Sequence, residues 1–173
     1  SYAYSESAAT VLTPRTKGFI QYMEALNAEG NLKSGLNAYK YKLTDDYGKQ
    51  PEINLLEGTG GNLVYDTVVE RVEIVTNKSL NAFALAFDGY INISADENVE
   101  FTLMADDGAV LYIDGRKVID ISGVHAVMTG SGSLPLAAGL HTIRIEYFEN
   151  GNGNSELLFT CSDQNSEFLH REV

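Results

Sequence analysis

The stretch ADDGAVLYIDGRKVID, residues 105 to 120, combines an acidic turn with a β-hairpin. Asp114-Gly115 separates two short apolar runs, and this dipeptide is typical of a two-residue hairpin because a type I′ turn needs positive φ at both central positions. Directly before the hairpin, Asp106 and Asp107 place adjacent carboxylates in a turn that ends in Gly108. The stretch therefore predicts an antiparallel hairpin preceded by a candidate cation site.

Short segments rich in Val, Ile, Tyr and Phe extend on both sides of this hairpin, with Gly, Asn and Asp clusters between them. In HTIRIEYF, residues 141 to 148, Ile143 and Ile145 fall on one face and Arg144 on the other, the period of a strand with one buried side. Eight or more such strands predict an all-β fold, an antiparallel β-sandwich or barrel. The expected strands are 36–43, 68–75, 82–94, 99–105, 110–114, 117–121, 141–148 and 156–161.

Residues 1–34 differ in texture from the rest of the chain and predict an N-terminal extension or the remnant of a preceding domain, with the β-sandwich module at 35–173. Within the extension, Phe19, Ile20, Met23 and Leu26 have roughly helical spacing, although GFIQY could equally form a strand. Two irregular surface loops are expected at 45–66, which contains Pro51 and Gly60-Gly61, and at 123–133.

Composition excludes several classes of function. The 173 residues have a formal net charge of −12 and no cluster of Lys and Arg, which opposes binding to nucleic acid. The longest uncharged apolar run, residues 82 to 87, is far shorter than a membrane-spanning helix, so we expect no membrane insertion. The opening SYAYSESAATVL lacks the pattern of a signal peptide, so a mature or excised chain is expected. The single cysteine, Cys161, lies in an alternating run and predicts a small core residue.

Three stretches in order, 87–91, 105–120 and 136–159, resemble the module named after the amino-terminal domain of the anthrax protective antigen. The resemblance covers roughly residues 35 to 162 and includes the Asp-Asp-Gly turn, the Asp-Gly hairpin and the loop ENGNGN at 149–154. It implies a β-sandwich of the kind found in bacterial toxins, glycosidases and adhesins, several of which bind glycans. Fold membership does not by itself establish that function.

In the sugar-binding members, the resemblance implies, the paired aspartates are joined by a cis peptide and chelate one calcium ion that holds vicinal sugar hydroxyls. Consecutive side chains of a strand point to opposite faces, so Asp106 and Asp107 can share an ion only where the backbone departs from extended geometry. Calcium takes about 6 to 8 oxygen ligands, and amide oxygens are suitable ones. The expected metal ligands are Asp106, Asp107, Asn150, Asn152 and Asn154, and the expected ligand-binding residues are Asp106, Asp107, His125 and Asn152.

A plainer interpretation remains open for each element. The Asp-Asp-Gly stretch is also ordinary turn chemistry, in which carboxylates cap backbone N–H groups, and the asparagine loop is also an ordinary hairpin loop. For His125, a structural hydrogen bond is the alternative to ligand binding. The absence of Trp in this chain removes the best stacking platform for a sugar.

The sequence contains no nucleophile elbow, phosphate-binding loop or HExxH motif, so a non-catalytic module is expected. Two functions stay in contention. The first is a calcium-dependent carbohydrate-binding module of a larger secreted or surface protein, such as a glycoside hydrolase or adhesin, with a glycan as partner. The second is an accessory interaction domain that packs against neighbouring domains of its parent protein. The expected location is extracellular, at the cell surface or periplasmic.

Overall fold

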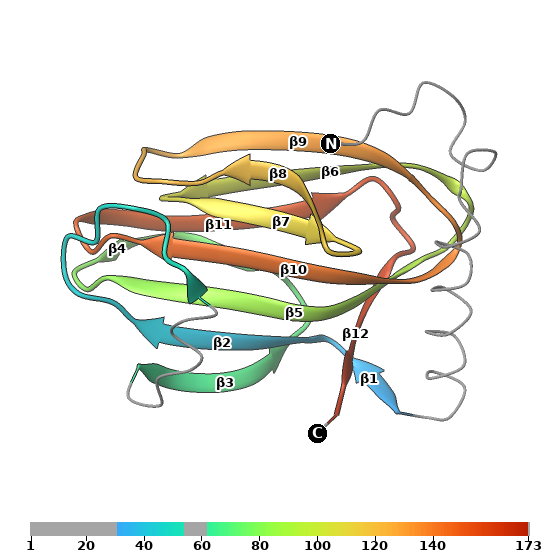
Figure 1. The fold of residues 1–173 in the computed structure, drawn as a ribbon, viewed down its shortest axis with the longest axis horizontal. Coiled ribbons are helices and arrows are strands. Elements are labelled where there is room, and N and C mark those ends of the chain that lie inside the picture. The colour runs from blue at the N-terminus through green and yellow to red at the C-terminus, as the bar shows by residue number, and fades with distance from the viewer. Residues whose placement is uncertain (1–30, 54–61, 173) are drawn as a thin grey trace.

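The computed structural model describes residues 31–53 and 62–172, and these form two antiparallel sheets packed face to face (Figure 1). The larger sheet has the order β1-β12-β5-β10-β7-β8, with β2 also pairing with β5, and β3 pairing with β2. The smaller sheet has the order β4-β11-β6-β9. The strands are β1 (Leu32–Ser34), β2 (Leu36–Lys42), β3 (Leu63–Val69), β4 (Glu73–Ser79), β5 (Phe83–Ile93), β6 (Glu97–Asp106), β7 (Ala109–Ile113), β8 (Arg116–Ile121), β9 (Met128–Leu136), β10 (Gly139–Glu149), β11 (Gly153–Cys161) and β12 (Glu167–Arg171). The predicted all-β antiparallel sandwich is confirmed.

The main core lies between the two sheets and follows the period of two seen in the sequence. In β10, Ile143, Ile145 and Tyr147 are fully buried, and they belong to the same core cluster as Phe101 and Leu103 of β6. Arg144, on the other face of β10, forms ion pairs on the outside of the sheet. Burial of these apolar side chains is the main contribution that holds the sheets together.

The Asp-Gly hairpin forms as predicted. Asp114 and Gly115 connect β7 to β8 with φ angles of 51° and 77°, and Ile113 pairs with Arg116 across the turn. Both φ angles are positive, as a type I′ turn requires.

Three predicted segments are wrong in detail. The single strand expected at 68–75 is two strands, because the chain crosses from the larger to the smaller sheet at residues 70–72, and the loop expected at 45–66 ends where β3 begins at Leu63. The loop expected at 123–133 contains the start of β9. A Cβ at Gly130 would lie 2.8 Å from side-chain atoms of Ile119 and Ile121, so glycine there permits β9 to approach β8 closely. The N-terminal segment 1–30 and its predicted helical spacing lie outside the described residues.

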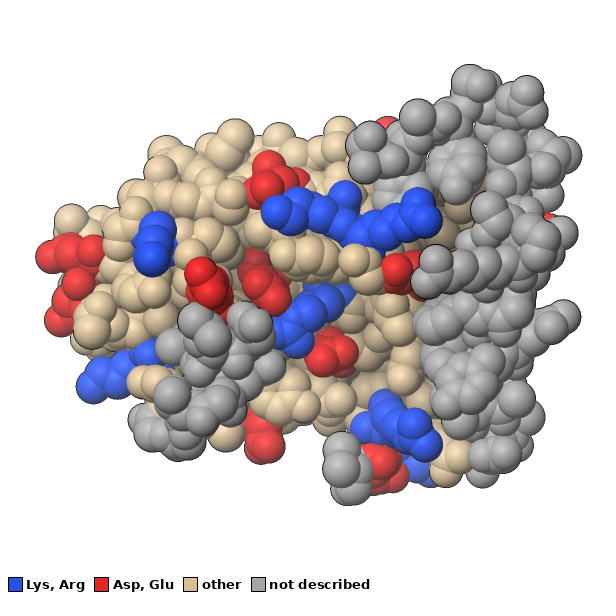
Figure 2. Space-filling view, in the orientation of Figure 1, with Lys and Arg blue, Asp and Glu red and all other residues tan. Residues whose placement is uncertain are grey.

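The β6–β7 turn, the β8–β9 loop and the β10–β11 turn meet at one end of the sandwich, on the left in Figure 1. The first part of the β2–β3 connection, residues 43–53, lies at the same end. The predicted boundary between residues 34 and 35 falls between β1 and β2, and β1 pairs with β12 in the larger sheet. On the face drawn in Figure 2, basic and acidic side chains are interspersed. Within the described ranges, no helix has both the length and the apolar character needed to cross a membrane.

Candidate functional site

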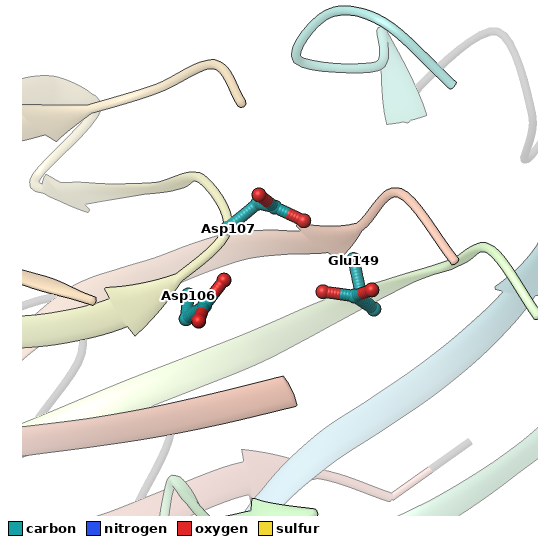
Figure 3. Close-up of side chains that lie close together, drawn as sticks. All are labelled: Asp106, Asp107 and Glu149. Atoms are coloured by element: carbon teal, nitrogen blue, oxygen red, sulfur yellow. The ribbon is translucent and has the colours of Figure 1, made fainter. Parts of the chain in front are cut away.

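The acidic turn brings three carboxylates together at the loop end of the sandwich. Asp106 is the last residue of β6, Asp107 follows it across a cis peptide bond, and Glu149 is the last residue of β10. Each offers one oxygen, and these three atoms all lie within 4.8 Å of one another. Figure 3 shows the three side chains directed toward a common space. The two adjacent aspartates therefore do not diverge to opposite faces as they would on a regular strand.

Backbone donors from two loops hold the Asp107 side chain. Its Oδ1 accepts the N–H of His125 at 3.1 Å, and its Oδ2 accepts the N–H of Asn150 at 2.9 Å. Asp107 is only 4% exposed, so these charge-assisted hydrogen bonds replace water that it has lost. Each oxygen keeps a further lone pair for another partner.

The backbone at Asp106 is held from the core. The hydroxyl of Tyr147 donates to the carbonyl oxygen of Asp106 at 2.5 Å, and Asp106 pairs in register with Glu156 of β11. Burial raises the pKa of Asp106, and repulsion from Asp107 adds to this rise. The turn thus keeps two negative charges close together in a partly dehydrated place.

Glu149 is a member of this cluster that we did not predict from the sequence. It is 1% exposed, and its Oε2 accepts the N–H groups of Gly151 and Asn152 at 2.9 and 3.2 Å. Its Oε1 is buried and has no hydrogen-bond partner among the described residues. Burial raises the pKa of Glu149 to about 7, and the neighbouring Asp107 side chain adds to the rise. One signal is present in the sequence, since a period of two places Glu149 on the core-facing side of β10, with Ile145 and Tyr147.

The three predicted asparagines occupy different places. The backbone N–H of Asn150 contacts Asp107, while its Oδ1 accepts the N–H of Asn152 at 3.1 Å, as in an Asx turn. Asn152 is exposed, and Asn154 is an exposed residue of β11 in register with Lys78 of β4. Proximity to the carboxylates is thus established for the backbones of Asn150 and Asn152, and the roles of the three amide groups as ligands stay predictions.

His125 makes structural hydrogen bonds, as the alternative interpretation of this residue predicts. Its Nδ1 and Nε2 each lie 2.7 Å from a backbone carbonyl oxygen, of Ala126 and Ile121 respectively. The ring therefore shapes the β8–β9 loop, and the same loop supplies the N–H that Asp107 accepts. A direct role of His125 in ligand binding stays a prediction.

The first part of the β2–β3 connection, residues 43–53, borders the acidic turn. Gln50 accepts the N–H of Gly123 through its Oε1 at 3.1 Å, and its Nε2 is buried without a hydrogen-bond partner among the described residues. A Cβ at Gly108 would lie 2.1 Å from that same Oε1, so the third residue of the Asp-Asp-Gly turn must be glycine for Gln50 to pack there. The sequence suggests no role for Gln50, because nothing in its local pattern marks it.

The donor set fits a hard divalent cation such as calcium. The cluster contains only carboxylate oxygens, which are the ligands that calcium prefers, and no sulfur or imidazole nitrogen belongs to it among the described residues. No described residue donates to the buried Oε1 of Glu149, so an oxygen is available for an ion. Asp106, Asp107 and Glu149 are thus the described carboxylates that could hold it.

Two packed antiparallel sheets with an acidic cluster at one loop end define a class of β-sandwich module, and comparison with known proteins identifies the family. The model of the PA14 domain family matches residues 32–169. Since this match covers more than half of the chain, the chain belongs to the PA14 domain family. This confirms the resemblance inferred from the acidic turn and its flanking strands.

Solved structures share the fold at low sequence identity. The PA14 domain of the antifreeze protein MpAFP is 16% identical with a TM-score of 0.68, and the match covers 78% of this chain and 84% of that one. A PA14 sugar-binding domain from an RTX adhesin is 15% identical with a TM-score of 0.65, covering 78% and 93%. A subtype-switched epithelial adhesin A domain from Candida glabrata, in complex with beta-lactose, is 12% identical with a TM-score of 0.62, covering 83% and 90%. A comparison with curated proteins finds no match.

Proposed function

We propose that this domain is a non-catalytic carbohydrate-binding module whose glycan binding depends on calcium. The observation that carries the proposal is the convergence of the Asp106 and Asp107 carboxylates, with their acidic neighbour, at the end of the sandwich where three loops meet. Structural neighbours described as a sugar-binding domain and as an adhesin domain in complex with beta-lactose support it. An adhesin or a glycoside hydrolase would be a suitable parent, on the cell surface, in the periplasm or outside the cell.

Asp106 and Asp107 would hold the ion, and Asn150 and Asn152 of the adjoining turn, with Asn154 at the start of β11, would complete its oxygen shell. A bound calcium ion would supply a positive charge that attracts the vicinal hydroxyl oxygens of a sugar. Asp106 is partly exposed while Asp107 is buried, so the outer side of the cluster is the side that a sugar can approach. His125 of the β8–β9 loop and Asn152 of the β10–β11 turn would contact the sugar.

Calcium should raise the thermal stability of the whole chain. A free calcium concentration about 100 times the Kd adds about 2.7 kcal/mol to the free energy of unfolding. For a domain of this size each kcal/mol raises Tm by roughly 2 to 4 °C, so a shift of several degrees is expected between calcium and EDTA. Thermal unfolding followed by circular dichroism measures it, and an unchanged Tm in calcium would contradict the calcium dependence.

Glycan binding needs its own experiment. Binding of the labelled chain to a glycan array is expected in calcium and should be lost in EDTA. Double replacement of Asp106 and Asp107 by Asn should abolish the binding in calcium, and circular dichroism should show that the variant stays folded. If the array stays empty although calcium raises Tm, the ion is structural and the sugar-binding proposal is wrong.

One observation favours the second candidate function, an accessory interaction domain. Strand β3 pairs only with β2 among the described strands, and it leaves large apolar side chains in solvent. Such a strand at the edge of a sheet is suited to contact a neighbouring domain. A calcium-independent domain that binds no glycan would agree with this candidate. The exposed apolar residues of β3 are Leu63, Val64, Tyr65 and Val68.

A further inference from the structure

The side chain of Glu149 is buried, yet only one of its two carboxylate oxygens accepts hydrogen bonds from the described residues. One carboxylate oxygen, Oε2, accepts two backbone N–H groups and thereby orders the start of the β10–β11 turn. The other, Oε1, is buried without a donor among the described residues, although the side chain is 1% exposed and belongs to the three-carboxylate cluster. Leaving a buried charged oxygen without a partner is unfavourable, so a ligand that provides positive charge is expected at this atom.

A proton and a metal cation are the two partners that could satisfy Oε1. A proton shared between Glu149 and Asp107 would join only two of the three carboxylates and would leave Asp106 as a charged neighbour. A divalent cation can contact one oxygen from each of the three, because these oxygens lie within 4.8 Å of one another. Asp107 remains available to such a cation, since each of its oxygens accepts one N–H group from the described part of the chain and keeps a further lone pair.

We propose that Glu149 is the third carboxylate ligand of the cation that Asp106 and Asp107 hold, and that it forms the buried wall of the site. This inference rests on the proposed calcium dependence. In this proposal the third anionic ligand is the last residue of β10, which directly precedes the loop that contains the three asparagines. The charged ligands then come from the ends of two strands, β6 and β10, which the core holds in place.

Three carboxylates give the site more negative charge than a divalent cation neutralises. The site should therefore bind calcium before any sugar is present, and it should also bind trivalent lanthanide ions. Terbium is a useful probe because tyrosine sensitises its luminescence, and the Tyr147 hydroxyl lies 2.5 Å from the carbonyl oxygen of Asp106. The role of Glu149 can therefore be tested through calcium and terbium binding, without knowing which sugar the domain binds.

The test compares Glu149→Gln with Glu156→Gln in the full chain. Both variants remove one negative charge near Asp106, because Glu156 is in register with Asp106 and also raises its pKa, yet Glu156 is outside the three-carboxylate cluster. Calorimetric titration with calcium and terbium luminescence give the affinities. Glu149→Gln should weaken calcium binding at least about tenfold, since even the loss of a residue that only hydrogen-bonds a metal ligand lowers metal affinity about tenfold or more. Glu156→Gln should weaken it by no more than about threefold.

The outcomes separate the two proposals. If the unaltered chain binds neither calcium nor terbium, the calcium dependence itself is wrong. If it binds calcium and the two variants have equal affinities, Glu149 is not a ligand, and calcium binding stands without it. The side-chain amide that Glu149→Gln introduces can donate to Asp107, so the variant should stay folded in EDTA. Should it unfold, Glu149→Asp keeps the charge on a shorter side chain, and terbium luminescence equal to that of the unaltered chain would overturn the proposal.

Discussion

The acidic turn at Asp106-Asp107 and the hairpin turn at Asp114-Gly115 lie at opposite ends of β7, and both contain aspartate close to a histidine. At the hairpin, Asp114 Oδ2 lies 2.7 Å from Nδ1 of the fully buried His141, and Asp114 Oδ1 accepts the N–H of Thr142 at 3.1 Å. The other ring nitrogen of His141 lies 2.9 Å from the carbonyl oxygen of Ala137. Both oxygens of Asp114 therefore have protein partners.

The two turns differ in the number of carboxylate oxygens that have no hydrogen-bond donor among the described residues. At the hairpin, the His141 ring and the Thr142 N–H contact one Asp114 oxygen each. At the acidic turn three carboxylates lie together, and one buried oxygen of Glu149 has no donor among the described residues. An aspartate turn with matched donors stabilises a fold, whereas one with acceptors in excess is suited to bind a cation.

The largest expected effect comes from removing the Asp114 carboxylate, which contacts the buried ring of His141. Asp114→Ala leaves the buried His141 ring nitrogen and the Thr142 N–H without their acceptor and should lower the free energy of unfolding by about 3 kcal/mol, since each buried polar group left unsatisfied costs about 1 to 3 kcal/mol. At roughly 2 to 4 °C per kcal/mol, Tm should fall by about 10 °C, equally in calcium and in EDTA. Asp120→Ala is the control, because Asp120 is an exposed partner of Lys117 on the same hairpin and should change stability by less than about 1 kcal/mol. A loss confined to calcium would place the hairpin in the ion site.

Glycine replacements in the two turns should differ in both size and calcium response. A Cβ at Gly108 would lie 2.6 Å from the N and 2.7 Å from the O of Gly123, so Gly108→Ala should cost about 1 to 3 kcal/mol and reduce the calcium-induced rise in Tm. Gly115 has a φ of 77° but nothing within 4 Å of its added Cβ, so Gly115→Ala should cost about 1 kcal/mol through backbone conformation alone. Thermal unfolding with and without calcium measures both. A Gly115 variant that loses the calcium response would contradict the separation of the two turns.

Most of the fold could be predicted because it rests on local patterns. The alternation in 141–148 and the Asp-Gly dipeptide each report geometry set by neighbouring residues, and β10 and the β7–β8 hairpin form where expected. The errors lie where contacts with residues far away in the sequence determine the secondary structure. The pattern at 68–75 predicts one strand instead of β3 and β4 because no Gly or Pro marks the crossing at residues 70–72, and β9 has the pattern of a loop because its glycines serve contacts with β8.

The candidate site could be predicted only where a motif marks it. The adjacency of Asp106 and Asp107 in a recognisable turn indicates a site, and the structure brings their carboxylates together. The signal at Glu149 is weaker, because its alternation with Tyr147 places a carboxylate on the core-facing side of a strand but says nothing of its partners. Gln50 has no local signal at all, since its contact with Gly123 joins residues far apart in the sequence.

The smallest expected effect is also the one whose sign is most informative. In EDTA, Asp106→Asn removes a charge that burial and Asp107 disfavour, as the raised pKa of Asp106 indicates, so Tm should rise by about 1 to 3 °C. In calcium the same variant loses a ligand and should melt below the unaltered chain. Asp114→Asn is the matched control, because it weakens the pair with His141 and should lower Tm in both conditions. If Asp106→Asn lowered Tm in EDTA as well, Asp106 would be a structural acceptor like Asp114, and the contrast between the two turns would not hold.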